Sequence, residues 1–180
     1  MANPLEFHLE EQKSSEWCWA ATAVAIGNFY QDPNCAQRQC QLVSQVLQLG
    51  KDCCEDCDCT PGSFEPCNQT QNLGFILDKI GHGRDGTDGL SSMEFSEIQA
   101  EIDSGHPICV SIEWNEAAAA GHAIVIYGYD EEKRLLFIAD PKAPAGTTIT
   151  VLFDGFTYPE FGGPVRGSWK AAFRTLRTGE

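Results

Sequence analysis

The sequence predicts an α+β fold in which a helical N-terminal half packs on a C-terminal antiparallel sheet. Between residues 16 and 102, apolar side chains recur every three or four positions, as on helices with one buried face. From residue 108 onward the period falls to two, as in strands with one buried face. The chain has 180 residues, 42% of them apolar, which suffices for one buried core and is too short for two ordinary domains. Residues 1–180 are therefore expected to form a single domain.

The chain is expected to begin with a short strand and a buried helix. Apolar and polar side chains alternate over residues 5–9, which is the pattern of a strand. The helix follows at about residues 16–30, where apolar side chains and alanines recur at helical spacing. Ser14 or Ser15 can cap its start, and Asp32 with the following proline ends it.

Three shorter helices are expected before the sheet. The pattern over residues 42–49 closes at Gly50, a residue that commonly ends helices. Residues 73–80 carry a second apolar stripe. Ser91 and Glu94 form a capping box that opens the last helix, which continues to about residue 102.

Strands follow in the C-terminal half, and two of them are expected to form a hairpin. They are predicted at residues 108–114, 122–129, 135–140 and 147–153. The first of them should be half-buried, with alternate side chains facing the core. If Tyr129 pairs with Lys133 across the hairpin turn, His122 lies opposite Asp140 on the same face of the sheet.

The charge and hydropathy of the chain exclude several kinds of partner. Twenty-six acidic residues against twelve basic ones give a net charge of −14, so a nucleic-acid-binding surface is not expected. No apolar run approaches the roughly 18 to 20 residues that span a bilayer, so membrane insertion is not expected either. Residues 1–11 lack the basic and apolar stretches of an export signal. The composition fixes no oligomeric state.

Nine cysteines are many for a protein of a reducing cytosol, and seven of them lie between residues 35 and 67. This cysteine-rich insert favours up to three disulfides whose pairing the spacing does not reveal. The alternative is a zinc site, although the insert holds a single CxxC and no histidine. Its candidate ligands are Cys54, Cys57, Cys59 and Cys67. No other metal or cofactor is expected. The cysteines favour a secreted or translocated protein, with a cytoplasmic one as the alternative.

Cys18 is the candidate nucleophile. It lies in the first turn of the predicted helix, where unpaired N–H groups and the helix dipole favour a thiolate. Trp17 and Trp19 flank it, can shield it from water, and are candidate substrate-binding residues. The alternative is a buried core cysteine with no chemical role. We expect Trp114 to be a core residue.

His122 is the candidate base among four histidines. It begins an apolar strand, where packing gives little reason for a polar ring. The predicted hairpin brings Asp140 to it, and a carboxylate there can fix the tautomer of the ring and stabilise its charged form. His8, His82 and His106 are expected to be structural or solvated.

These residues resemble the papain-like cysteine peptidases, especially a compact bacterial branch that includes plant-pathogen effector proteases and soluble relatives of bacteriocin-leader peptidases. The matching segments, in chain order, are Gln12, Trp17-Cys18-Trp19-Ala20-Ala21, Gly121-His122-Ala123 and Asp140-Pro141. The resemblance implies that Cys18 attacks a carbonyl carbon and that His122 activates it and later protonates the leaving amine. It implies that Asp140 orients His122. Gln12, six positions before Cys18, then helps to form the oxyanion hole.

The resemblance implies a bacterial thiol hydrolase of papain-like fold that cleaves peptide or isopeptide bonds in a protein or peptide substrate. Three departures separate the chain from papain: Ser15 replaces the extra cysteine, His122 follows Cys18 by only 104 positions, and Asp140 replaces the usual asparagine. One alternative is a glutamine deamidase or acyltransferase, because the same thioester forms and only the acceptor differs. A non-catalytic, cysteine-rich binding or metal module is the other alternative.

Overall fold

The computed structural model describes residues 2–32, 34–35, 38–54, 66–115, 121–163 and 165–179. Its helices are α1 (Cys18–Phe29), α2 (Gln39–Leu47), α3 (Leu73–Lys79) and α4 (Phe95–Asp103). Its strands are β1 (Ala2–Pro4), β2 (Ile108–Trp114), β3 (His122–Asp130), β4 (Leu135–Ala139), β5 (Ile149–Leu152), β6 (Tyr158–Pro159) and β7 (Arg166–Arg174). Within these ranges, none of the helices has the length and apolar character needed to cross a bilayer.

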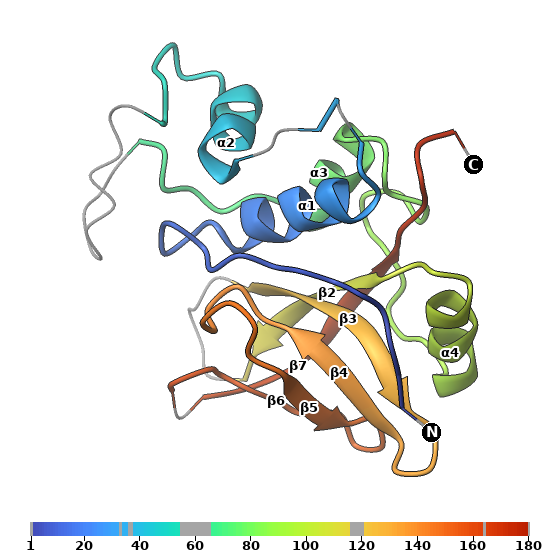
Figure 1. The fold of residues 1–180 in the computed structure, drawn as a ribbon. Helices are drawn as coiled ribbons and strands as arrows, with labels where there is room; N and C mark the ends of the chain where they lie inside the picture. Colours follow the sequence, from blue (N-terminus) through green and yellow to red (C-terminus); the bar gives the residue numbers. More distant parts are fainter. Residues whose placement is uncertain are drawn as a thin grey trace.

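The strands form one antiparallel sheet with helices on both faces. The strand order is β5-β4-β3-β2-β7-β6. β1 pairs with the last residues of β3, beyond the part of β3 that pairs with β2. In Figure 1, α1, α2 and α3 form a layer above the sheet, and α4 lies beside β2 and β3. One buried cluster joins α1, α2 and α3 to side chains such as Cys109 and Val125, and the other joins α4 to Ile108 and Ile124. The predicted α+β class is confirmed.

The predicted half-buried pattern of β2 holds for most of the strand, with Ile108, Val110, Ile112 and Trp114 buried on one face, and Cys109 is the departure from it. Cys109 faces the helical layer and is as fully buried as Ile108 and Val110 on the opposite face. The alternation of the side chains is as predicted. Cys109 is buried as well because helices cover both faces of the sheet at this end of β2.

The structure corrects the predicted strands at the two ends of the chain. The first strand is β1, before the predicted position, while residues 5–9 run past the sheet with alternating burial. Leu5 donates its N–H to the Tyr127 carbonyl, which continues the contact with β3 beyond the strand. Two strands, β6 and β7, were not predicted, although β7 pairs with the whole of β2.

The helices lie close to their predicted positions, but their capping residues differ. Trp17 caps α1, and Ser14 contributes only a backbone carbonyl, which accepts the Trp17 N–H at 3.2 Å. The capping box of α4 starts at Glu94 and not at Ser91. Gln48, at φ 51°, ends α2 in the left-handed conformation two residues before Gly50. Apolar spacing locates a helix better than it locates the residue that ends it.

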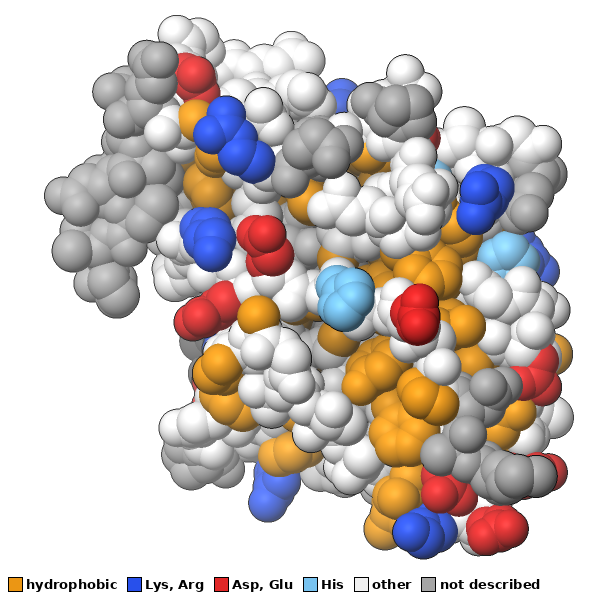
Figure 2. Space-filling view, viewed as in Figure 1, with side chains coloured by type: hydrophobic (Ala, Val, Ile, Leu, Met, Phe, Trp, Pro, Cys, Tyr) orange, Lys and Arg blue, Asp and Glu red, His pale blue; other side chains and the backbone are white. Residues whose placement is uncertain are grey.

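Apolar side chains gather over the sheet half of the face shown in Figure 2. A shallow hollow of about 600 Å³ lies there between the N-terminal segment and strands β3 and β4. Its apolar lining consists of Pro4, Leu5, Phe7, Tyr127 and Phe137. Neither Cys18 nor His122 lines this hollow.

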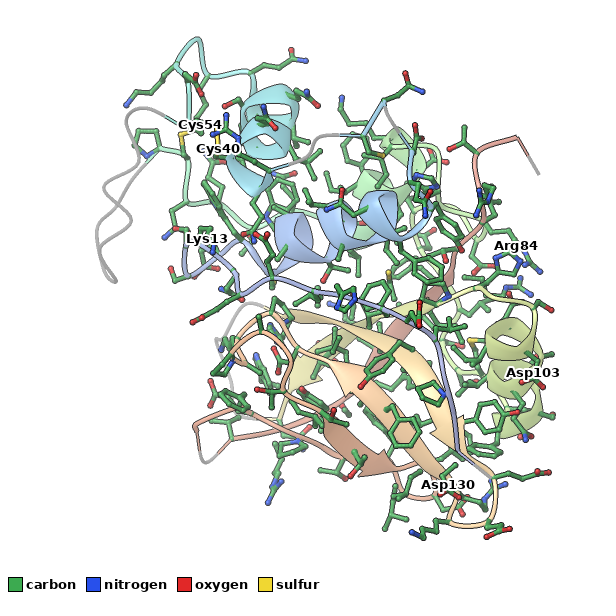
Figure 3. All side chains as sticks on the ribbon, in the orientation of Figure 1. Lys13, Cys40, Cys54, Arg84, Asp103 and Asp130 are labelled. Atoms are coloured by element: carbon green, nitrogen blue, oxygen red, sulfur yellow. A yellow bond between two sulfur atoms is a disulfide. The ribbon has the colours of Figure 1, made fainter. Side chains whose placement is uncertain are left out.

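Two disulfides hold the cysteine-rich segment, as favoured from the sequence. Cys40 pairs with Cys54 beside α2 (Figure 3), and Cys53 pairs with Cys67. These bonds leave Cys54 and Cys67 without a thiolate, so the zinc site that would have used both is wrong. Its other two candidate ligands, Cys57 and Cys59, lie outside the described residues.

Removal of the Cys53–Cys67 disulfide is expected to destabilise the protein more than removal of Cys40–Cys54. Each bridge spans a sequence separation of 14, so the loop-entropy contribution is the same for both, about 3 kcal/mol. Cys53 and Cys67 are fully buried, whereas Cys40 and Cys54 are partly exposed. We therefore expect Cys53→Ala/Cys67→Ala to lose an additional packing contribution, measured as the free energy of unfolding in urea. Equal losses in the two double variants would contradict this expectation.

Candidate active site

A cleft of about 390 Å³ brings Cys18 and His122 together from distant parts of the chain. Cys18 is the first residue of α1, and His122 is the first residue of β3. The lining also includes Asp88 and Lys170, which place one charge of each sign at the cleft. The volume lies within the range of sites that bind small ligands or short peptide segments.

The start of α1 is fixed by the segment that follows the disulfides. Trp17 Nε1 donates to the carbonyl of Cys67, and Trp19 Nε1 donates to the carbonyl of Gln69, both at 2.8 Å. Trp19 lines the cleft beside Cys18 and Trp17 does not, although both side chains are only 1% exposed. Of the two candidate substrate-binding tryptophans, only Trp19 therefore borders the cleft. Trp17 supports the site through packing.

The structure corrects the register of the hairpin that carries His122 and Asp140. Tyr129 pairs with Leu136 and not with Lys133, because the turn between β3 and β4 has four residues. Continued without interruption, this register would place the two side chains on opposite faces of the sheet. A β-bulge in the middle of β3 shifts the pairing by one residue. The shift returns Asp140 to the face of His122, at a position diagonal to it.

Asp140 holds His122 in a buried, hydrogen-bonded pair. The distance from His122 Nε2 to Asp140 Oδ1 is 2.7 Å. The same oxygen accepts the Lys142 N–H at 2.7 Å, and Oδ2 accepts the Tyr158 hydroxyl at 2.5 Å. Burial alone would raise the pKa of Asp140, but these three hydrogen bonds and the charge of His122 lower it. The carboxyl group is therefore ionised at neutral pH.

His122 is positively charged at neutral pH and faces Cys18. Burial lowers the pKa of His122, but the hydrogen bonds and charges of Asp140 and Cys18 outweigh burial and raise that pKa to about 9. Asp140 engages Nε2, which leaves Nδ1 as the ring nitrogen available to Cys18. The arrangement is an imidazolium between a carboxylate and a thiol, at the N-terminus of a helix.

Two aromatic residues that the sequence analysis did not place at the site pack around this pair. Tyr158 is fully buried in β6 and donates to Asp140; burial and the Asp140 charge raise the pKa of its phenol, which therefore keeps its proton. No periodic pattern surrounds Tyr158, so no sequence signal marked it. Trp114, predicted as a core residue, is buried and stacks on His122, with the ring centroids 5.8 Å apart. Lys142 Nζ lies 5.6 Å from the Trp114 ring.

Gln12 lies near the site, but its side-chain donors point elsewhere. Its N–H donates to the Pro141 carbonyl at 2.7 Å, which fixes the segment beside the end of β4. Its Nε2 donates to the carbonyls of Ser14 and Ser15, while Oε1 is buried without a hydrogen-bond partner among the described residues. Both side-chain N–H groups are thus occupied in this conformation. Gln12 can donate to a substrate oxygen only after its amide rotates.

The other histidines lie outside the cleft lining. His8 is exposed, His106 contacts the Tyr30 hydroxyl through Nδ1 at 3.1 Å, and His82 is fully buried. The cleft also lacks a metal-ligating group of three side chains within the described ranges. Among the described residues, one such group, which includes His82, lies outside the cleft near the other end of α1.

Comparison with known protein families places most of the chain within a single family model. The model, described as "Peptidase_C39 like family", matches residues 4–157. The matched segment contains Gln12, Cys18, His122 and Asp140, and it ends one residue before Tyr158. No curated protein matches the chain.

Proposed function

Because the chain belongs to the Peptidase_C39-like family and is related to the papain-like cysteine peptidases, we propose that it is a thiol hydrolase that cleaves peptide bonds through a covalent acyl-enzyme. The observation that carries the proposal is the position of His122, which is held by Asp140 at 2.7 Å and interacts with Cys18 in the same cleft. The helical layer and the sheet correspond in this proposal to the two halves of a papain-like fold, in a single domain.

In the proposed reaction, Cys18 is the nucleophile and His122 is the acid and base. The Cys18 thiolate attacks the carbonyl carbon, and the carbonyl π electrons move to the oxygen. When the tetrahedral intermediate collapses, the C–N bond breaks and His122 gives its proton to the leaving amine. Water, deprotonated by His122, then attacks the thioester and releases the acid and the free thiol. Asp140 keeps Nε2 occupied, so that Nδ1 performs each proton transfer.

The negative charge on the carbonyl oxygen needs donors close to Cys18. The Cys18 backbone N–H is in the first turn of α1, where an N–H has no carbonyl acceptor within the helix. The helix dipole also favours negative charge at this end. Gln12 is the second donor in this proposal. Since its amide now donates to two carbonyls, substrate binding must turn it toward the cleft. The unpartnered Oε1 means that such a rotation gives up no hydrogen bond at the oxygen.

The proposed substrate is a protein or peptide. The net charge of −14 favours segments that are neutral or basic near the cleaved bond, and Asp88 in the cleft wall can pair with a basic side chain. Isopeptide bonds present the same carbonyl and amine and remain within the proposal. The two disulfides support a secreted or translocated protein, as an oxidising environment maintains such bonds.

Product masses separate peptide cleavage from action on glutamine side chains. We expect incubation with a mixture of unfolded proteins to give two shorter products from each cut substrate, with one water added. Deamidation would instead leave the chain intact with a mass gain of about 1 Da, because water replaces the side-chain amine. The matched control is the same mixture with enzyme that has been fully alkylated at Cys18. Intact substrates that gain only this mass would overturn the peptidase proposal in favour of a deamidase.

A further inference from the structure

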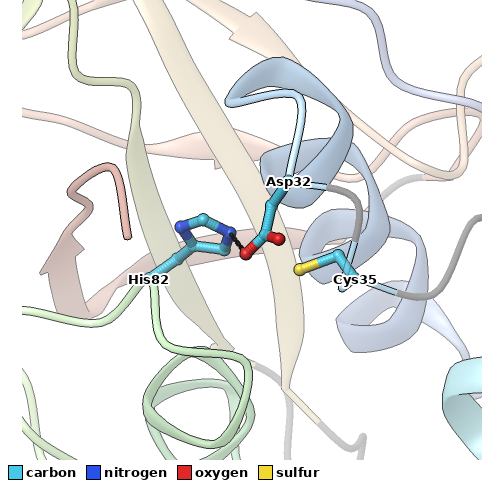
Figure 4. A group of neighbouring side chains, drawn as sticks. All are labelled: Asp32, Cys35 and His82. Carbon is cyan, nitrogen blue, oxygen red and sulfur yellow. Dashed lines mark ion pairs between the residues drawn. The ribbon is translucent and has the colours of Figure 1, made fainter. Parts of the chain in front are cut away.

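Asp32, Cys35 and His82 converge just beyond the C-terminal end of α1 (Figure 4). One potential ligand atom from each, a carboxylate oxygen, the thiol sulfur and a ring nitrogen, lies within 4.8 Å of the other two. His82 is completely buried, Cys35 is 9% exposed, and the Asp32 side chain is 8% exposed. A carboxylate, a thiol and an imidazole that share one buried site form a donor set suited to a divalent transition metal.

The hydrogen bonding of His82 leaves one nitrogen without a partner inside this cluster. Nδ1 lies 2.9 Å from the Leu176 carbonyl, which can only accept a proton, so the Nδ1–H donates. In the neutral ring Nε2 then carries a lone pair. Nε2 is buried, has no hydrogen-bond partner among the described residues, and lies 3.4 Å from Asp32 Oδ2. Two acceptors that face each other need a proton or a metal ion between them. A backbone carbonyl on the other ring nitrogen is the usual support of a metal-ligating histidine.

The separations fit a tetrahedral zinc ion. Zinc bonds of about 2.0 to 2.2 Å to nitrogen and oxygen place the two ligand atoms about 3.3 Å apart, close to the observed 3.4 Å between His82 and Asp32. A Zn–S bond of about 2.3 Å requires about 3.6 Å between the sulfur and either atom. Cys35 Sγ lies within 4.8 Å of both atoms, so it has to approach them by no more than about 1.2 Å to reach this distance. Gly27 of α1 makes room for that side chain, because a Cβ there would lie 2.8 Å from Cys35 Sγ.

The charges in the cluster also favour a cation. The Asp32 carboxylate accepts the Asn34 N–H at 2.8 Å and the Thr178 hydroxyl at 2.9 Å, which fixes its position. The sulfur of Cys35 and a ring nitrogen of His82 lie within 4.8 Å of this carboxylate. A bound divalent ion stabilises the thiolate, and the thiol proton passes to solvent.

We propose that Asp32, Cys35 and His82 bind a zinc-type divalent ion, with water as the fourth ligand. The three residues belong to the end of α1 and to the loop after α3, and Leu176 and Thr178 tie the cluster to the C-terminal segment. The 12 residues of α1, about 18 Å at 1.5 Å per residue, separate Cys18 from the cluster. The ion is therefore structural: it cross-links three segments behind the nucleophile helix and takes no part in cleavage.

Metal binding is best tested in Cys18→Ala, because Cys18 and His122 could themselves bind zinc. The probe is Co²⁺, which replaces zinc and shows thiolate charge-transfer and tetrahedral d–d absorption. We expect one Co²⁺ per chain, displaced by Zn²⁺, and an increase in the unfolding temperature with either ion. Further change of Cys35→Ala or His82→Gln should abolish both effects. The matched controls, Cys109→Ala and His106→Gln, should retain them.

A second measurement keeps the proposal testable if those variants fail to fold. In Cys18→Ala alone, Zn²⁺ should protect Cys35 from alkylation, as located by peptide mass mapping, and should leave the slow alkylation of Cys109 unchanged. The proposal is overturned if Co²⁺ does not bind, or if Cys35 alkylates at the same rate with and without Zn²⁺. Either result would leave the contact between His82 and Asp32 as an ion pair without a metal ion. Neither outcome bears on peptide cleavage, which uses other residues.

Discussion

Replacement of Cys18 by alanine is expected to abolish peptide cleavage, with a loss in kcat of about 10⁴-fold or more. The substitution removes the atom that forms the thioester, and water in its place has no acyl-enzyme route. Cys18 lies at the surface of the cleft with 9% exposure, so loss of its sulfur leaves little cavity in the core. The measurement is hydrolysis of a peptide identified in the product-mass experiment, with wild type and variant side by side. Unfolding temperatures of both proteins show whether the fold is retained.

Cys109→Ala is the matched control, because Cys109 is also a described cysteine outside the two disulfides but is buried in the sheet. Burial raises the pKa of the Cys109 thiol, so it should react slowly with iodoacetamide. We expect iodoacetamide to alkylate Cys18 rapidly, at the same rate at which the enzyme loses its activity. If Cys18→Ala retained cleavage and Cys18 alkylated no faster than a model thiol, the chain would be a non-catalytic binding module.

The features that the sequence predicted correctly depend on local patterns. Helical spacing located α1 and placed Cys18 in its first turn, and the change of period at residue 108 located β2. The relationship to the papain-like cysteine peptidases was also correctly inferred, from short motifs at residues 12, 17–21, 121–123 and 140–141. Each of these helices, strands and motifs is encoded by residues that are neighbours in the sequence.

The features that the sequence did not predict depend on contacts between distant segments. The predicted hairpin register was wrong. The longer turn alone would place Asp140 on the opposite face of the sheet from His122, and a bulge in β3 returns it to the same face. Neither turn length nor bulge is marked by the alternation of apolar residues. Tyr158 contacts Asp140 from a two-residue strand, too short to show any period. His82 lies outside the lining of the cleft, and its neighbours Asp32 and Cys35 form no sequence motif with it.

The amide of Gln12 shows what the spacing between a motif residue and the nucleophile does not predict. Six positions before Cys18 is where the resemblance places an oxyanion-hole donor, and the backbone of Gln12 does lie against Pro141 at the site. The direction of the amide depends on which carbonyls are near it, and here those of Ser14 and Ser15 take both protons. Spacing fixes the position of a backbone, whereas the local hydrogen bonds fix the side chain.

Removal of the Asp140 charge is expected to shift the pH dependence of cleavage to lower pH. The active form carries protonated His122, whose pKa is raised to about 9, so kcat/KM should fall as pH rises through about 9. Asp140→Asn keeps an oxygen that can accept from His122 Nε2 and from the Lys142 N–H, but it has no charge. The alkaline limb of the profile should therefore move down by about 1 to 2 pH units. Asp140→Ala also frees the ring, and we expect a further loss in kcat of about 10²-fold or more.

Tyr158→Phe is expected not to move the alkaline limb to lower pH, in contrast to Asp140→Asn. A merely structural role of Asp140 would not explain this difference between the two variants. The phenol proton partly neutralises the Asp140 carboxylate through Oδ2, and phenylalanine keeps the buried ring without that proton. The carboxylate then attracts the His122 proton more strongly, so the alkaline limb should stay in place or move to higher pH, with kcat reduced by less than about 10-fold. Peptide hydrolysis is measured from about pH 5 to about pH 10. A shift in the same direction for both variants would show that disturbed packing, and not the charge of Asp140, controls His122.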